Sequence, residues 1–355
     1  MSRFLADRYQ PLVAYTPGEQ PTDMKYIKLN TNESPFPPSP GVIKAIGAES
    51  VRELRLYSDP TCGKLRETIA KEFGFEKANV FVSNGSDDIL NFSFMAFCQD
   101  GVAFPSISYG FYSVYADLYG LDTEKIDLTD DFRVDYRDYL NLGRTVVIAN
   151  PNAPTGIALS KDEVEEIVRS NPDHVVLIDE AYVDFGAESC LDLVHRYENL
   201  LVVRTFSKSY SLAGARLGYA FGNEALIADL EKIKYSTNPY NINRLTLLAG
   251  TAAIEENDYY MQNCRKIQEN RDYTTRELRE MGFEVLPSCA NFIFAKSEKI
   301  GGEELYLKLK KNGILVRHFT AERIKEYNRI TIGTFEEMKT LVETVRRILA
   351  EQADS

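Results

Sequence analysis

The sequence predicts an α/β protein, with a large domain built on a mainly parallel sheet covered by helices on both faces and a small α+β domain after it. Short apolar runs that end in polar residues alternate with helical segments, which is typical of parallel strands joined by helical crossovers. A long helical stretch then leads to three more apolar runs near the C-terminus. The length of 355 residues is sufficient for two cores of unequal size.

The first forty residues are rich in proline and asparagine. The stretch "LNTNESPFPPSP" contains Pro35, Pro37 and Pro38, and proline fixes φ and removes a backbone donor. We therefore expect an extended arm that lies on a surface of this molecule or of a partner. Residues 1–45 are assigned to this arm and to part of the small domain.

Residues 46–265 are assigned to the large domain. Its first clear helix is "KLRETIAKEFG", where Leu65, Ile69 and Phe73 recur at helical spacing. In the helical segment "LSKDEVEEIVRS", Ser160 and Glu163 form a capping-box signature. Strands are expected in "NVFVSNG", "GVAFPS", "RTVVIANP", "HVVLIDEAY", "LLVVRTFS" and "RLGYAFG". Ligands collect at the carboxyl ends of the strands in such a sheet.

Residues 266–355 are assigned to the small domain. The long helical stretch "LTLLAGTAAIEENDYYMQNCRKIQENRDYTTRELREMG" is expected to break near Asn257, to end at Gly282 and to cross out of the large domain. After it, "NFIFAK", "GILVRHF" and "NRITIGT" predict three strands, accompanied by two helices.

Composition and charge argue against several kinds of partner. A net charge of -12 repels nucleic acid and anionic lipid, so neither is expected to bind. The N-terminus lacks the apolar core of a signal peptide, and no stretch approaches the roughly 20 apolar residues of a membrane span, so we expect a cytoplasmic protein. The five cysteines and three histidines lack the spacing of metal ligands, so we expect reduced, mostly buried thiols and no metal.

Polar residues that can carry chemistry follow three of the predicted strands. After "NVFV", a turn opens a helix and presents free backbone N–H groups to an anion. After "HVVLI" stands Asp179, a carboxylate that needs a donor or a cation where it leaves a buried strand. After "LLVVRTF" comes Lys208, followed further on by Arg216.

Together these groups fit pyridoxal phosphate. Its aldehyde needs a lysine with which to form an imine, and an acid must keep its ring nitrogen protonated as an electron sink. We expect Lys208 to form the imine and later to move the substrate's proton, and Asp179 to meet the ring nitrogen. Tyr109 is expected to stack on the ring, with Phe111 and Tyr112 as alternatives. The phosphate is expected to bind a cradle of Gly85, Ser86, Asp87, Ser207 and Arg216.

The chain resembles a known family over nearly its full length. The motifs are "KLNTNESPFPPSP", "LYSDPTCGKLRETIA", "VSNGSDDIL", "NPNAPTG", "LIDEAYVDF", "TFSKSYSLAGARLGYA" and "NRITIGT", in the order found in the fold-type I pyridoxal-phosphate aminotransferases. The likeness is greatest to the histidinol-phosphate aminotransferases of histidine biosynthesis. It implies that small-molecule amino donors and oxo acids are the substrates, with histidinol phosphate plus 2-oxoglutarate interconverted with imidazole-acetol phosphate plus glutamate.

The resemblance also implies roles for individual residues. Tyr182 would bond the ring oxygen of the cofactor. Tyr57 would reach the phosphate of the neighbouring subunit's cofactor, in a homodimer with active sites at the interface. Arg329 would pair with the substrate carboxylate or phosphate, with Tyr15 and Arg317 as further contacts to the substrate phosphate.

One position departs from the family pattern. The family often has a second asparagine immediately before "PTG", where it bonds the ring oxygen, and this chain has Ala153 there. Either Asn152 takes over this contact or Tyr182 acts alone.

Three alternatives stay open at this point. An aromatic amino-acid aminotransferase would keep every cofactor residue and differ only in the substrate pocket. A threonine-phosphate decarboxylase shares the fold and a phosphate-bearing substrate, but often carries extra cysteine-rich sequence at its end, where this sequence has a helical pattern. A non-catalytic module of this fold is disfavoured by Lys208 and Asp179.

Overall fold

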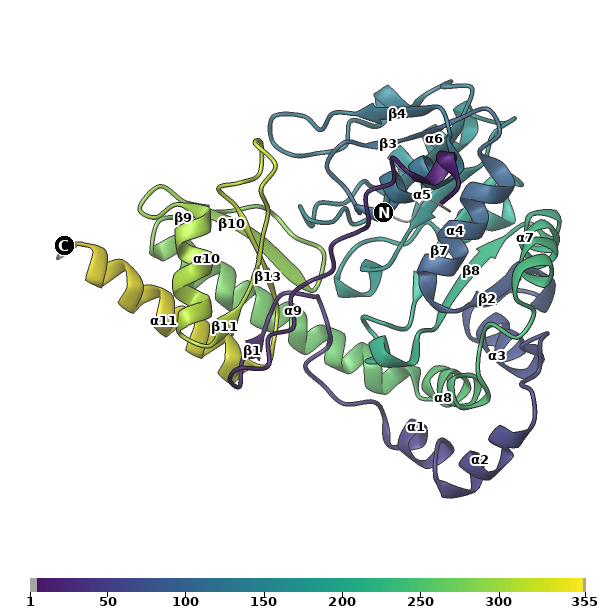
Figure 1. The fold of residues 1–355 in the computed structure, drawn as a ribbon, viewed down its shortest axis with the longest axis horizontal. Helices are drawn as coiled ribbons and strands as arrows, with labels where there is room; N and C mark the ends of the chain where they lie inside the picture. Colours follow the sequence, from purple (N-terminus) through teal and green to yellow (C-terminus); the bar gives the residue numbers. More distant parts are fainter. Residues whose placement is uncertain (1–4, 354–355) are drawn as a thin grey trace.

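A computed structural model describes residues 5–353, and its centre is a seven-stranded sheet in the order β2-β8-β7-β6-β5-β3-β4. Only β8 runs antiparallel to its neighbours, which confirms the mainly parallel sheet (Figure 1). Edge strand β4 was not predicted, because three of its four residues are polar and it is partly exposed. The strands are β2 (Val80–Ser83), β3 (Val102–Pro105), β4 (Thr123–Ile126), β5 (Thr145–Ala149), β6 (Val176–Asp179), β7 (Leu200–Thr205) and β8 (Gly218–Gly222).

Helices cover both faces of this sheet, as predicted. Successive residues of a strand point to opposite faces. Ile178 of β6 therefore joins a core with α3, α6 and α8, whereas its neighbour Leu177 joins a core with α4, α5 and α7. The capping box predicted at Ser160 and Glu163 begins α6. These helices are α3 (Gly63–Phe73), α4 (Gly85–Phe97), α5 (Phe111–Tyr119), α6 (Lys161–Ser170), α7 (Glu224–Thr237) and α8 (Arg244–Glu255).

A long helix, α9 (Asn257–Glu280), carries the chain from the large sheet to a second, four-stranded sheet (Figure 1). The break between α8 and α9 lies at Glu256, next to the predicted position, and the helix stops just before Gly282, whose φ is +93°. Tyr260 of α9 packs in a core beside the large sheet and Leu278 in a core beside the small sheet. The boundary proposed between residues 265 and 266 thus falls inside α9 and stays a prediction.

The second sheet is antiparallel, in the order β12-β13-β10-β9. The three predicted runs contain its strands β10, β12 and β13, and β9 was not predicted. The elements of this part are β9 (Phe283–Val285), β10 (Phe292–Ser297), α10 (Gly302–Lys311), β11 (Ile314–Leu315), β12 (Arg317–His318), β13 (Asn328–Thr331) and α11 (Phe335–Ala353).

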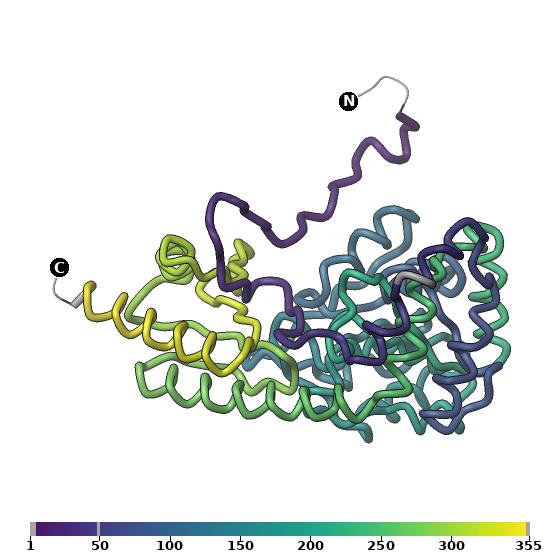
Figure 2. The backbone as a smooth tube through the Cα atoms, turned by 90° about the horizontal axis from the view of Figure 1, so that it is seen from below, coloured from purple at the N-terminus to yellow at the C-terminus, as the bar shows by residue number. Residues whose placement is uncertain are grey.

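The N-terminal segment, residues 5–39, is mostly extended, and Figure 2 shows its first part standing out from the rest of the molecule. Its strand β1 (Ile27–Lys28) pairs with β11, which ties it to the small sheet. Two short helices, α1 (Pro40–Ala45) and α2 (Ala48–Arg52), follow it and were not predicted. All five cysteines are free thiols, four of them buried, as expected. No helix between residues 5 and 353 is long and apolar enough to cross a membrane.

Candidate active site

Two neighbouring cavities meet at Lys208. The cradle cavity is lined by the last residues of β5, β6 and β7, so it lies at the carboxyl ends of the strands, as predicted. The arginine cavity lies between the N-terminal segment and the small sheet and contains Arg317 and Arg329. The residues that line both are Thr31, Tyr109, Ala153, Tyr182 and Lys208.

Two glycines allow the predicted phosphate cradle to close. Gly85 begins α4 with a φ of +79°, and a Cβ there would lie 2.8 Å from Nη2 of Arg216. A Cβ on Gly218 would collide with the backbone nitrogen of Ser86. Glycine at both positions therefore lets the guanidinium, the helix N-terminus and Ser207 converge on one wall of the cavity.

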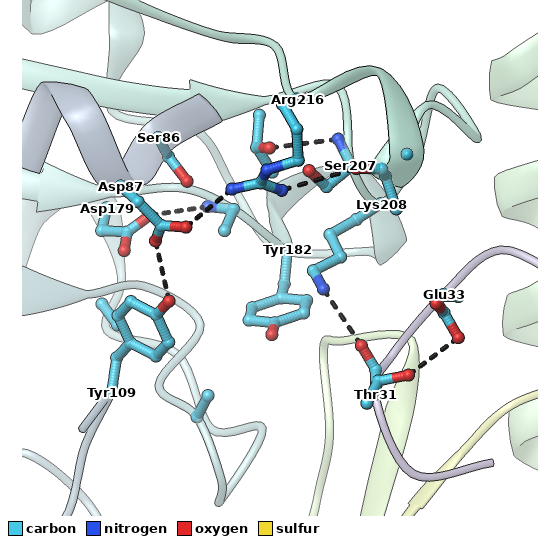
Figure 3. Close-up of a pocket in the computed structure, with 16 residues that line it drawn as sticks. Thr31, Glu33, Ser86, Asp87, Tyr109, Asp179, Tyr182, Ser207, Lys208 and Arg216 are labelled. Atoms are coloured by element: carbon cyan, nitrogen blue, oxygen red, sulfur yellow. Dashed lines mark hydrogen bonds and ion pairs between the residues drawn. The ribbon is translucent and has the colours of Figure 1, made fainter. Parts of the chain in front are cut away.

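The Asp87 carboxylate lies in this cradle but is already bound by two donors. It accepts hydrogen bonds from Nη2 of Arg216 and from the hydroxyl of Tyr109, both at 2.8 Å (Figure 3). A carboxylate repels a phosphate, so this side chain orients Arg216 and Tyr109 rather than contacting the anion itself. Asp87 can serve an anion through its backbone N–H in the first turn of α4.

Asp179 ends β6 and is 4% exposed. Its carboxylate accepts hydrogen bonds from the hydroxyl of Tyr112 at 2.9 Å and from the Ala181 N–H at 3.2 Å. Burial raises the pKa of Asp179 to about 6, against the effect of these two donors. A cation placed next to this carboxylate would favour its charged form. A charged carboxylate is the partner that a protonated ring nitrogen requires.

Of the three aromatic candidates for ring stacking, only Tyr109 lines the cavities. Tyr112 is completely buried and directs its hydroxyl to Asp179. The ring of Phe111 packs on Tyr15, with 4.3 Å between the centroids. Tyr109 thus remains the candidate.

Lys208 follows β7 and projects toward the N-terminal segment (Figure 3). Its Nζ donates to the carbonyl oxygen of Thr31 at 3.2 Å and lies 5.8 Å from the ring centroid of Tyr182. The nearby Glu33 is bound by Lys28 at 2.6 Å and by the Thr31 hydroxyl at 2.7 Å. An amine at this junction has access to both cavities.

Asn152 does not reach either cavity. Its Oδ1 accepts from the Ser108 hydroxyl at 2.7 Å, and its Nδ2 donates to the carbonyl oxygen of Ile107 at 3.0 Å. Of the two alternatives at Ala153, a contact from Asn152 is therefore corrected, because its amide holds the loop after β3, and a contact from Tyr182 alone stays a prediction. Ala153 itself lines both cavities and offers them only a methyl group.

The arginine cavity brings together Tyr15, Arg317 and Arg329, as predicted. Nη2 of Arg329 donates to the carbonyl oxygen of Asn30 at 3.1 Å, while its buried Nε has no hydrogen-bond partner among the described residues. Burial lowers the pKa of Arg329, and the like charge of Arg317 acts in the same direction. An anion would relieve both effects, so this cavity favours a carboxylate or a phosphate.

Tyr57 lies apart from both cavities. It is 79% exposed and stacks on Tyr240, with 4.6 Å between the ring centroids. A contact from Tyr57 to a cofactor therefore requires a second copy of the chain.

Three residues that support the site were not among the predicted site residues: Thr31, Asn32 and, as the partner of Asp179, Tyr112. The first two lie in the stretch "NTNES", which carries the resemblance but has no local pattern that points to a role. The tyrosine was considered only for stacking, since nothing in the sequence shows which way a helical side chain points.

Comparisons with known proteins agree with this geometry. The family model for aminotransferase class I and II matches residues 24–345. A histidinol-phosphate aminotransferase of Brachyspira hyodysenteriae is 52% identical over 352 residues, covering 98% of this chain and 99% of the relative. One of Marinomonas sp. is 49% identical over 353 residues, covering 98% and 100%.

Among solved structures, histidinol-phosphate aminotransferase from Sinorhizobium meliloti in complex with pyridoxal-5'-phosphate has a TM-score of 0.84 at 24% identity, covering 92% of each chain. This structural similarity shows the fold, and the sequence matches show the family. The chain belongs to the class I and II aminotransferase family.

Proposed function

We propose that the protein is a pyridoxal-phosphate-dependent transaminase of histidine biosynthesis that interconverts histidinol phosphate plus 2-oxoglutarate with imidazole-acetol phosphate plus glutamate. The observation that carries this proposal is the position of Lys208 between an anion cradle and a cavity with two arginines. The two relatives at 52% and 49% identity, both named histidinol-phosphate aminotransferases, support the choice of substrate.

The residues of the cradle cavity fit pyridoxal phosphate. The N-terminus of α4, the hydroxyls of Ser86 and Ser207 and the guanidinium of Arg216 would hold the phosphate, in a cradle that a side chain at Gly85 would fill. The carboxylate of Asp179 would hold the ring nitrogen. When bound, the cofactor supplies the electron sink that makes the substrate α-carbon acidic.

The protein's own groups then bind, orient and move protons. Nζ of Lys208 takes the proton from the α-carbon of the amino donor, and in the second half-reaction it delivers a proton to the α-carbon of the product. The Thr31 carbonyl oxygen orients this amine by accepting one of its hydrogens. Asp179, held by Tyr112 and Ala181, keeps the proton on the ring nitrogen.

The arginine cavity would select the substrates by charge. Histidinol phosphate carries a phosphate and glutamate a side-chain carboxylate, so Arg317 and Arg329 can serve both in turn. The rings of Tyr15 and Tyr109 offer stacking faces to the imidazole. An aromatic amino acid offers the two guanidiniums only the single charge of its α-carboxylate, whereas the phosphate of histidinol phosphate carries nearly two charges, which disfavours the aromatic aminotransferase.

We infer further that the protein is a cytoplasmic homodimer. Exposed apolar residues cluster in the sequence around Tyr57, including Ile43, Val51, Leu54 and Leu56, and such surfaces are typical of interfaces. The projecting N-terminal segment offers a second contact (Figure 2). Free thiols are typical of a reducing compartment. Light scattering after size-exclusion chromatography should give twice the chain mass, and a monomer would contradict the dimer.

The visible absorbance of the purified, cofactor-loaded protein tests the activity directly. Histidinol phosphate alone should bleach the band of the lysine-bound cofactor, and 2-oxoglutarate should restore it. A band that phenylalanine bleaches and histidinol phosphate leaves unchanged would favour the aromatic aminotransferase. Release of CO₂ from threonine phosphate would favour the decarboxylase.

A further inference from the structure

Asn32 connects the N-terminal segment to two other parts of the molecule. It is 1% exposed and has a φ of +57°, a conformation that asparagine tolerates better than most residues. Its backbone N–H donates to Oγ1 of Thr331 at 2.9 Å, and its carbonyl oxygen accepts from Nδ2 of Asn291 at 3.0 Å. The small sheet and the strand connection beside it therefore hold this residue in place.

The Asn32 amide bridges two hydroxyl groups. The hydroxyl of Thr331 donates to Oδ1 at 3.0 Å, and the amide nitrogen faces Tyr182. Nδ2 donates to the hydroxyl oxygen of Tyr182 at 3.0 Å. An amide nitrogen donates but does not accept, so the proton of Tyr182 cannot return to Asn32.

The hydroxyl proton of Tyr182 must therefore point away from Asn32. The groups around the ring restrict the directions that remain. The ring packs perpendicular to that of Phe292, with 5.0 Å between centroids and 90° between the ring planes. The side chain lines both cavities, where the neighbouring Ala153 contributes no polar side chain. The free donor of this phenol is therefore available to a ligand at the junction.

We propose that Asn32 is a positioning residue that directs the hydroxyl proton of Tyr182 toward the ring oxygen of bound pyridoxal phosphate. A phenol that accepts one hydrogen bond becomes a stronger donor of its own, so Asn32 strengthens this contact as well as aiming it. This inference rests on the proposed function, because it needs the cofactor in the cradle cavity. It also explains how the site functions with Ala153 and without a contact from Asn152.

The test measures the pH at which the visible absorbance of the bound cofactor changes, without substrate. The titratable groups around the Tyr182 hydroxyl are Lys208, Arg329 and Tyr112, and all three are kept. Asn32→Asp preserves shape and tolerates positive φ, but its oxygen accepts the Tyr182 proton and removes the donor from the cofactor. The midpoint should rise by about one pH unit, a tenfold change.

Two further variants separate the hydrogen bond from the added charge. Asn32→Gly removes the amide without a charge and suits the backbone, and it should shift the midpoint in the same direction by less. Asn30→Asp places the same charge in the wall of the arginine cavity, with the Asn30 amide bonded to the Glu19 carbonyl, and should shift the midpoint by less than half as much.

The deciding measurement is a double-variant cycle with Tyr182→Phe. If Asn32 acts through the phenol, Asn32→Gly should produce no further shift once the hydroxyl is gone, and Asn32→Asp only the smaller shift that its charge causes. Additive shifts would overturn the proposal, and so would an unchanged midpoint in Asn32→Asp. A wild-type protein that never develops the cofactor band would instead contradict the proposed function, so the two failures are distinguishable.

Discussion

The cradle cavity and the arginine cavity are assembled in different ways. Asp179 ends β6 and Lys208 follows the neighbouring parallel strand β7, and such a sheet brings strand ends together at a single edge. The arginine cavity instead joins Tyr15 of the N-terminal segment to Arg317 of β12 and Arg329 of β13. A site at the edge of a parallel sheet is visible in the order of the sequence, whereas a site closed by distant segments becomes visible only by resemblance or in three dimensions.

The largest effect is expected in the cradle cavity, where the chemistry is concentrated. Lys208→Ala should lower turnover by at least about 10²- to 10⁴-fold, because it removes the group that moves the proton. Turnover by the loaded enzyme measures this, and the exposed Lys232→Ala is the matched control. Near-normal turnover in a folded Lys208→Ala protein would remove this lysine from the mechanism.

Asp179→Asn should lower turnover by about 10²- to 10³-fold, since an amide cannot stabilise a cationic ring nitrogen. It should also stabilise the cofactor-free protein at neutral pH. The pKa of Asp179 in the folded protein is raised to about 6, so the folded protein binds a proton at this carboxylate more tightly than the unfolded chain does. The contribution of Asp179 to stability therefore falls as pH rises from about 4 to about 6, and stays low above that.

Urea unfolding of the cofactor-free wild type and Asp179→Asn between pH 4 and pH 8 measures this effect. The variant should gain up to about 3 kcal/mol above pH 6, and the gain should vanish near pH 4. Equal free energies of unfolding for the two proteins at pH 8 would mean that burial does not destabilise the charged Asp179 carboxylate.

In the arginine cavity, Arg329→Ala should raise the KM for both histidinol phosphate and glutamate by about 30-fold or more, with a smaller change in kcat. The Arg317 guanidinium donates long hydrogen bonds to the carbonyl oxygens of Thr16 and Pro17, both at 3.4 Å, and its loss should cost less, about fivefold. Steady-state kinetics with each substrate compare the two. A normal KM for glutamate in Arg329→Ala would contradict the proposal that one pocket binds both substrates.

The smallest effect is expected at the surface. Tyr57→Phe should weaken cofactor binding by about tenfold, the effect of one hydrogen bond to a charged phosphate, if a partner subunit brings this hydroxyl to the cradle. Tyr240→Phe, which keeps the stacked pair, is the control. Cofactor release followed by absorbance would show equal rates in the two variants if Tyr57 had no role across an interface.

The sequence by itself determined the features that depend on local pattern. The parallel strands, the capped α6 and the break between α8 and α9 follow from apolar periodicity and capping residues close together in the chain. The position of Asp179 and Lys208 at strand ends follows from the same pattern. Edge strand β4 shows the limit of prediction from local pattern, because a half-exposed strand has no continuous apolar run.

The tertiary structure decided which way the polar side chains of the site point. Asn152 turns to Ser108 and does not line either cavity, and Tyr112 turns to Asp179. Asn32 meets Tyr182, a residue 150 positions away. Such hydrogen bonds join residues that local propensity cannot relate, because packing of the surrounding cores brings them together and the cost of burying an unpaired polar group then selects the partner.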